Sequence, residues 1–154
     1  MATAIVLVSV QALAGDAYPK GPDHNLTPGS YCTHPDNYRY PERIPYCNRD
    51  VSTSEKMDII RQYNEKLGYR IERGQRAQFK IDHLIPLCAG GSNEITNLWP
   101  QHMSVYRVTD PIEGLACQRM AEGKLTQKKA VDMIFAAKLD LSKAPEIIEQ
   151  LQEM

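Results

Sequence analysis

The sequence lacks a long hydrophobic run, a charge excess of either sign and closely spaced cysteine pairs, and each absence excludes a class of protein. No apolar stretch approaches the roughly 18 residues of a membrane-spanning helix. With 18 basic and 19 acidic residues the net charge is −1, so any nucleic-acid-binding surface must be a local patch. A hydrophobic fraction of 42% excludes a fully disordered chain, and 154 residues are enough for one domain.

The four cysteines indicate an oxidising compartment. No two of them form a Cys-x-x-Cys pair, which argues against a zinc knuckle and against a thioredoxin-like redox site. In an exported protein they would pair, and three connectivities are open. We favour Cys32–Cys47, because both lie in a segment rich in Pro and Tyr, together with Cys88–Cys117. Four buried free thiols are the alternative.

The first 14 residues have the pattern of a cleaved export signal. Ile5–Val10 is a short apolar core, and Ala12 and Ala14 offer small side chains where a signal peptidase reads. No Lys or Arg precedes the apolar core, which favours the alternative of a buried first strand. We expect residues 1–14 to be a signal peptide and the protein to be exported, periplasmic or secreted, with no membrane partner.

The remaining chain, residues 15–154, is predicted to form one domain of the α+β class. Residues 15–50 show neither helical nor strand periodicity, and we interpret them as an irregular N-terminal arm held by a disulfide. Three further parts follow: a helix and a basic segment over 52–78, a strand–loop–strand–helix unit over 79–123, and C-terminal helices over 124–154.

Local capping patterns set the expected helices. Ser52 and Glu55 fit a capping box, and Gly68 is a natural terminator. Helical spacing predicts that Met57, Ile60, Tyr63 (or Asn64) and Leu67 face inward on this first helix. Three later helices are predicted. The first runs from Asp110, with Pro111 in the first helical position, to about Gly123. The second runs from Thr126 to about Leu139, with Val131 and Leu139 facing inward, and the third covers about 142–152.

A local basic excess lies directly before the predicted strand that begins at Phe79. We call Arg70, Arg73, Arg76 and Lys80 the basic shoulder. It is either an ordinary solvated surface or a set of nucleic-acid-binding residues that contact backbone phosphates.

An Asp-His pair on the strand predicted over Phe79–Leu87 is the most informative feature of the sequence. Phosphodiester hydrolysis needs a base to activate water and a cation to neutralise phosphate charge. A neutral His83 suits the first task, and the carboxylate of Asp82 can bind a hard ion such as Mg²⁺. Asn97 begins a second short strand that we expect Pro100 to end, and its amide can hold the imidazole or the neighbouring loop by hydrogen bonds. Alternatively, His83 is a hydrogen-bonded core residue and Asn97 forms a turn.

This segment resembles the HNH family of His-Me-finger nucleases, in an exported bacterial branch. The resemblance covers about residues 79–123 and implies a ββα-metal finger with one divalent metal ion, Mg²⁺ or else Mn²⁺. It implies an endonuclease that cleaves DNA, or RNA, and leaves 5′-phosphate ends. We expect little sequence specificity, because the sequence shows no helix-turn-helix, zinc finger or long basic recognition helix. His83 would be the general base, Asp82 a metal ligand and Asn97 the supporting residue. The resemblance rests on Asp82-His83, Ile85-Pro86-Leu87, Gly90-Gly91 and Asn97-Leu98.

The sequence departs from that family at the helix ligand. A His or Asn should follow Asn97 by eight or nine residues, where Val105 and Tyr106 stand. We rank Glu113 first as the replacement ligand, because it falls in the first turn of the helix predicted from Asp110. His102 and Asp110 are the alternatives.

Strand geometry adds a difficulty, because neighbouring residues on a regular strand point to opposite faces. Asp82 and His83 could therefore reach one phosphate only on a distorted or edge strand. The competing functional hypothesis is a non-catalytic nucleic-acid-binding or structural module that retains the finger. Neither hypothesis requires an obligate protein partner.

Overall fold

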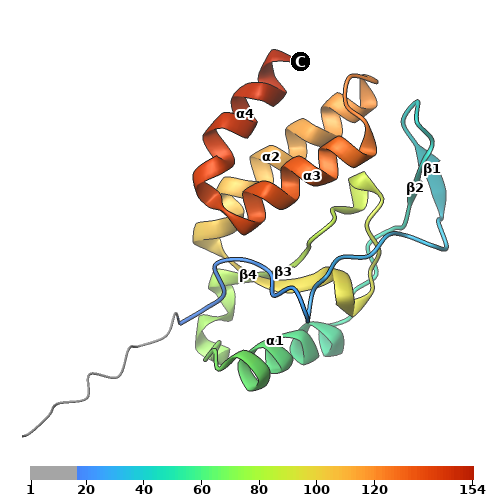
Figure 1. Cartoon of the computed structure of the whole chain (residues 1–154). Coiled ribbons are helices and arrows are strands. Elements are labelled where there is room, and N and C mark those ends of the chain that lie inside the picture. Colours follow the sequence, from blue (N-terminus) through green and yellow to red (C-terminus); the bar gives the residue numbers. More distant parts are fainter. Residues whose placement is uncertain (1–16) are drawn as a thin grey trace, which may run out of the picture.

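The protein has a mixed α+β fold with two small antiparallel sheets (Figure 1). The computed structural model describes residues 17–154, so the predicted signal peptide, residues 1–14, lies outside the described residues. Within the described range, no helix is both long and apolar enough to cross a bilayer.

The N-terminal arm contains a short hairpin that its sequence did not predict. Strand β1 (Asn37–Arg39) pairs in antiparallel register with β2 (Ile44–Tyr46). The Cys32–Cys47 disulfide joins the two ends of this segment, with a Cα–Cα distance of 5.9 Å. The hairpin was missed because its strands are only three residues long and β1 is exposed along its whole length, so no alternating pattern marks it.

Helix α1 (Thr53–Leu67) begins and ends where its capping residues predict. The Ser52 hydroxyl accepts a hydrogen bond from the Glu55 amide, and the Glu55 carboxylate accepts one from the Ser52 amide. Gly68 ends the helix in the left-handed conformation, with φ 75°. The inward face was predicted only in part: Ile59, Ile60 and Tyr63 are buried, whereas Met57 and Leu67 are each 36% exposed.

Strands β3 (Phe79–His83) and β4 (Leu98–His102) form the central hairpin, in which His83 lies opposite Leu98. The expected extension of the first strand to Leu87 is wrong, because the chain turns away after His83. The expected end of the second strand at Pro100 is also wrong. Pro100 stays within β4, which is possible because a strand of a two-stranded sheet has one edge that needs no amide donor.

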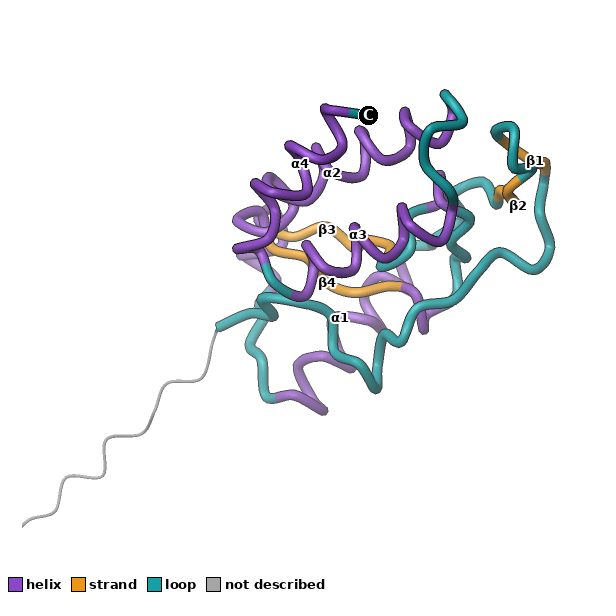
Figure 2. Tube along the Cα trace, turned by 45° about the horizontal axis from the view of Figure 1, so that its top comes forward, coloured by secondary structure: helices purple, strands orange, loops and turns teal. Residues whose placement is uncertain are grey.

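Three helices follow the central hairpin: α2 (Met103–Ala121), α3 (Gln127–Leu139) and α4 (Ala144–Glu153). They cover one side of the hairpin, and α1 lies on the other (Figure 2). The expected helix start at Asp110 is wrong. The cap is His102, whose Nδ1 accepts from the Ser104 amide, and Pro111 lies inside α2.

Two apolar clusters hold these layers together. One lies between α1 and the central hairpin and includes Tyr63 and Trp99, and the other joins α2, α3 and α4 around Ile112 and Ile134. Leu139, expected inward, is 64% exposed, whereas Val131 is buried and the Thr126 cap of α3 is confirmed.

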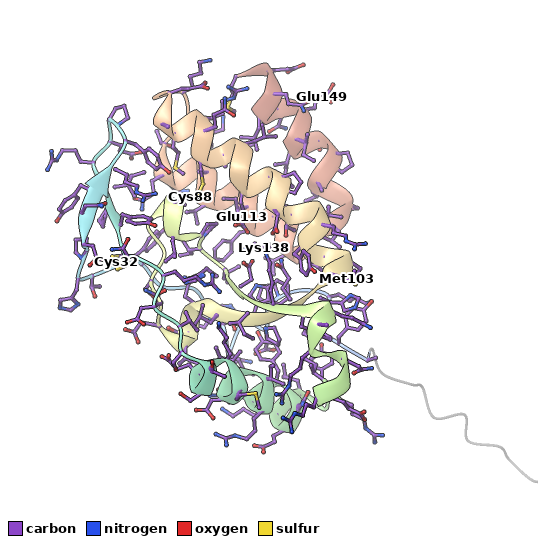
Figure 3. The ribbon with its side chains drawn as sticks, turned by 180° about the vertical axis from the view of Figure 1, so that it is seen from behind. Cys32, Cys88, Met103, Glu113, Lys138 and Glu149 are labelled. Carbon is purple, nitrogen blue, oxygen red and sulfur yellow. A yellow bond between two sulfur atoms is a disulfide. The ribbon has the colours of Figure 1, made fainter. Side chains whose placement is uncertain are left out.

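The second disulfide fixes the loop after β3 against the C-terminal helices. Cys88, in the short 3₁₀ helix η2 (Leu87–Ala89), bonds to Cys117 on α2 with a Cα–Cα distance of 5.9 Å (Figure 3). Both predicted pairings are therefore confirmed. Two disulfides are typical of proteins from an oxidising compartment.

Candidate active site

A pocket of about 290 Å³ lies where the N-terminal arm, the end of β3, η2 and α2 meet. Side chains of both charge signs line it, and they come from segments that are distant in the sequence. Its polar lining residues are Arg39, Tyr46, Arg49, Asp82, His83 and Glu113.

His83 is held in a defined tautomer. Its Nε2 lies 3.0 Å from Oδ1 of Asn93, whose amide nitrogen donates to the carbonyl of Asn48 at 2.7 Å. Because the Asn93 oxygen can only accept, His83 Nε2 carries the proton and Nδ1 keeps its lone pair. Arg49 Nη1, 3.3 Å away, donates toward that lone pair. Nδ1 is therefore the unprotonated nitrogen of the imidazole, the one that can accept a proton.

The surroundings of His83 keep the imidazole neutral. Burial lowers its pKa from 6.5 to about 4, and the positive charge of Arg49 acts in the same direction. The hydrogen bond to Asn93 and the charge of Asp82 oppose this shift without cancelling it. His83 is therefore a free base at neutral pH, as a general base must be before it takes a proton.

Asn97 fixes the loop between the two strands and does not touch the imidazole ring. Its side chain is fully buried: Oδ1 accepts from the Ile85 amide at 2.9 Å, and Nδ2 donates to the carbonyls of Ile85 and Ser92. The loop packs so closely here that a Cβ atom at Gly91 would overlap the Ile85 carbonyl. Asn97 was expected to hold either the imidazole or the neighbouring loop by hydrogen bonds, and in the structure it holds the loop.

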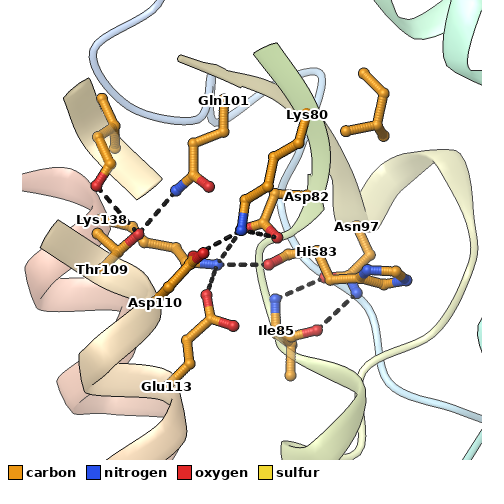
Figure 4. A network of polar contacts seen from close by, with 12 residues as sticks. Lys80, Asp82, His83, Ile85, Asn97, Gln101, Thr109, Asp110, Glu113 and Lys138 are labelled. Carbon is orange, nitrogen blue, oxygen red and sulfur yellow. Dashed lines mark hydrogen bonds and ion pairs between the residues drawn. The ribbon is translucent and has the colours of Figure 1, made fainter. Parts of the chain in front are cut away.

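The two candidate metal ligands share one buried ammonium group. Nζ of Lys138, on α3, lies 2.8 Å from Asp82 Oδ2 and 2.6 Å from Glu113 Oε1 (Figure 4). It also donates to the main-chain carbonyl of His83 at 2.6 Å. The Lys138 side chain is fully buried, so two hydrogen bonds, to Asp82 and to the His83 carbonyl, and the nearby charge of Glu113 replace its hydration shell.

Charge coupling sets the protonation of this cluster. Burial alone would lower the pKa of Lys138, but the charges of Glu113 and Asp82 outweigh it, and the net shift is upward. Burial alone would raise the pKa of Asp82, but the ammonium groups of Lys138 and Lys80 reverse that, and the net shift is downward. Burial and the Asp82 charge raise the pKa of Glu113 to about 7, against the pull of Lys138. Asp82 is therefore the firmly ionised carboxylate.

The structure brings Glu113 to the pocket but not the two alternative ligands. His102 lies at the far end of the central hairpin, stacked on Tyr18 with ring centroids 3.8 Å apart. Asp110 is exposed and pairs with Lys80 at 2.6 Å. Asp82 and His83 line one pocket despite being strand neighbours, because β3 ends at His83 and the chain turns there.

Asp82 and Glu113 are the candidate ligands for a divalent ion. Among the described residues, no group of three acidic, His or Cys side chains is spaced so that it could hold a metal ion. Mg²⁺, however, is commonly held by one or two carboxylates, with water and substrate phosphate oxygens as the other ligands. Asp82 and Glu113 provide two carboxylates in the pocket of His83. Oε1 of Glu113 is buried and lacks a hydrogen-bond donor in the described part of the chain, although Lys138 Nζ lies 2.6 Å from it as an ion-pair partner.

The four residues of the basic shoulder lie in different surroundings. Arg70 and Arg73 are exposed, and Lys80 pairs with the carboxylates of Asp110 and Asp82. Arg76 and Lys80 are half-buried and line one pocket.

Three residues of the site were missed by sequence reasoning. Asn93 lies inside the motif but looked like part of a turn, and nothing in the irregular arm marked Arg49. Lys138 did carry a signal, because it follows Val131 and Ile134 at helical spacing on the apolar face of its helix. A lysine at such a position needs a buried partner of opposite charge.

Comparisons of the chain with protein-family models, with curated proteins and with solved structures find no match.

Proposed function

We propose that the protein is a metal-dependent endonuclease that hydrolyses phosphodiester bonds of DNA, with RNA as the alternative substrate and with little sequence specificity. The observation that carries this proposal is the convergence in one pocket of a neutral His83, two carboxylates and the guanidinium of Arg49. A base, hard oxygen donors and a cation are the groups that this hydrolysis needs.

In this proposal His83 activates water through Nδ1. The proton on Nε2 stays bound to Asn93, which orients the ring and keeps Nδ1 unprotonated. Water gives a proton to Nδ1 as its oxygen bonds to phosphorus, and the bond from phosphorus to the 3′ oxygen breaks. The 3′ oxygen keeps the electron pair of that bond and takes a proton from solvent water, which gives a 3′-hydroxyl. Arg49, which contacts Nδ1 in the free protein, then pairs with a phosphate oxygen. The products carry 5′-phosphate ends.

Asp82 and Glu113 would hold the divalent ion, Mg²⁺ or else Mn²⁺. When bound, the ion supplies positive charge beside the phosphate oxygens and the leaving oxygen. Lys138 fixes the two carboxylates from the side of α3.

The order of elements supports assignment to the His-Me-finger class. A strand bearing Asp82 and His83, a loop fixed by Asn97, a second strand and a helix bearing Glu113 follow one another in the chain. This is the arrangement expected of a ββα-metal finger. The two disulfides support action outside the cytoplasm, in a periplasmic or extracellular space.

Circular plasmid DNA provides the test. We expect the purified protein with Mg²⁺ or Mn²⁺ to nick the plasmid and EDTA to stop the reaction. A folded protein that leaves DNA and RNA intact with every divalent ion tried would contradict the proposal.

One observation favours a second function, a non-catalytic nucleic-acid-binding module. The ammonium of Lys138 already neutralises the carboxylates that would hold the ion. Under this alternative the protein binds nucleic acid without cleaving it, and divalent ions leave its thermal stability unchanged.

A further inference from the structure

A second pocket, of about 360 Å³, lies beside the first, between α1 and β3. Apolar side chains, among them Met57, Phe79 and Ile81, form one part of its wall. Basic side chains form the other part, and no carboxylate lines it. We call it the α1 cleft.

Three cations of the α1 cleft are left without an acidic partner. Within residues 17–154, Arg49, Lys56 and Arg76 form no ion pair, whereas Lys80 pairs with carboxylates outside the cleft. Nε of Arg76 is buried and has no hydrogen-bond acceptor in the described part of the chain. A buried donor without an acceptor is costly and rare, so we look for the acceptor in a ligand.

Arg49 joins the α1 cleft to the candidate active site. It lines both pockets, with Nη1 3.3 Å from Nδ1 of His83 and Nη2 2.8 Å from the carbonyl of Ile81. A chain that places one phosphate beside His83 can therefore place its neighbouring nucleotide in the cleft.

We propose that the α1 cleft binds one nucleotide of a single-stranded nucleic acid, next to the phosphate that His83 attacks. The cationic wall suits the phosphate, and the apolar wall suits a base and its sugar. In a duplex the base faces are stacked inside, so an apolar wall can be reached only by a base of an unpaired strand. This inference rests on the proposed nuclease function and specifies its substrate as an unpaired strand, which a supercoiled plasmid also exposes where its duplex opens locally.

The test measures binding separately from cleavage, in the full-length His83→Ala protein with EDTA. Fluorescence anisotropy follows short fluorescein-labelled single strands of DNA and of RNA, and a DNA duplex of the same sequence. We expect both single strands to bind more tightly than the duplex. Arg76→Met should raise the Kd for single strands about fivefold to tenfold and flatten the salt dependence of binding by about one phosphate contact.

A matched control removes the same charge elsewhere. Arg70→Met lies in the same basic segment but outside the cleft, and it should change the Kd less than twofold, as measured beside Arg76→Met. Met57→Glu, which places a carboxylate on the apolar wall, should weaken binding as strongly as Arg76→Met. Thermal melting confirms that each variant is folded.

The outcomes separate this inference from the nuclease proposal. If Arg70→Met and Arg76→Met weaken binding equally, or if the duplex binds best, or if nothing binds at low salt, the nucleotide cleft is wrong even where cleavage occurs. If the expected pattern is found but the wild-type protein cleaves nothing, the cleft stands and the nuclease proposal fails.

Discussion

Lys138 and Asp82 form a buried ion pair, with Nζ 2.8 Å from Oδ2, that ties α3 to the end of β3 in the central hairpin. The two residues lie 56 positions apart in the sequence, and neither side chain is more than 9% exposed. Glu113 completes the cluster from α2. The same contact therefore stabilises the fold and positions both carboxylates of the candidate metal site.

Replacing Lys138 by Met should destabilise the protein severely. Glu113 would lose its counter-ion and Asp82 would keep only Lys80, whose Nζ lies 3.4 Å away. Removing one partner of a buried ion pair typically costs about 3–5 kcal/mol. Urea unfolding in EDTA measures the loss. Mg²⁺ should restore more stability to Lys138→Met than to the wild type, because the ammonium of Lys138 no longer competes with the ion for the two carboxylates.

Lys128→Met is the control for this variant. Lys128 forms an exposed pair with Asp132 on the same helix, and its loss should change little. Equal free energies of unfolding for Lys138→Met and Lys128→Met would show that the buried cluster contributes no more to stability than an exposed ion pair.

The dependence of stability on pH should contain two opposing contributions between about pH 4.5 and 6.5. The folded-state pKa of His83 is lowered to about 4, so its contribution is complete above pH 6.5 and is lost as the pH falls. The folded-state pKa of Glu113 is raised to about 7, so its contribution is complete below pH 4.5 and is lost as the pH rises. Each is on the order of a few kcal/mol.

Single variants should separate the two contributions. In EDTA, Glu113→Gln should make the free energy of unfolding rise with pH across this range, and His83→Gln should make it fall. Parallel profiles for the two variants would contradict the assigned protonation states.

Asn93 is predicted to be a positioning residue for the imidazole. Asn93→Ala removes the acceptor for Nε2, so kcat should fall at least tenfold while KM changes little. In Asn93→Asp the carboxylate stabilises the charged imidazolium, so the acid limb of the pH–rate profile should move to higher pH. An unchanged acid limb in Asn93→Asp would exclude this contact from the reaction.

The Cys88–Cys117 disulfide should matter for both stability and activity. It closes a loop of 29 residues and holds one wall of the candidate active-site pocket on α2. The double Ser variant should lose about 3 kcal/mol of stability, measured by urea unfolding. It should also cleave DNA more slowly at a temperature where it remains folded. Wild-type activity in the folded double variant would contradict a role of the Cys88–Cys117 disulfide in positioning this wall of the pocket.

Sequence reasoning succeeded where the determinants are local. The capping box at Ser52 and the terminator at Gly68 depend on residues within one helical turn, so the pattern alone predicts them. The same local reasoning failed at Asp110. Asp followed by Pro is typical of a helix start, but buried Val105 and Thr109 keep the preceding turns helical, and tertiary packing outweighs the local signal.

The candidate site was predictable only as far as its motif extends. Asp82, His83 and Asn97 are close in the sequence, and their types alone indicate the chemistry. Arg49 and Lys138 reach the pocket through the folding of the arm and of α3, which no local pattern encodes.

Nicking of circular DNA by His83→Ala is the most direct test of the account. The control is His24→Ala, which removes an exposed imidazole from the N-terminal arm. With Mg²⁺, the account predicts that wild type and His24→Ala nick the plasmid, that EDTA stops both, and that folded His83→Ala is at least a hundredfold slower. Nicking by His83→Ala at the wild-type rate would contradict the central claim that this imidazole activates water.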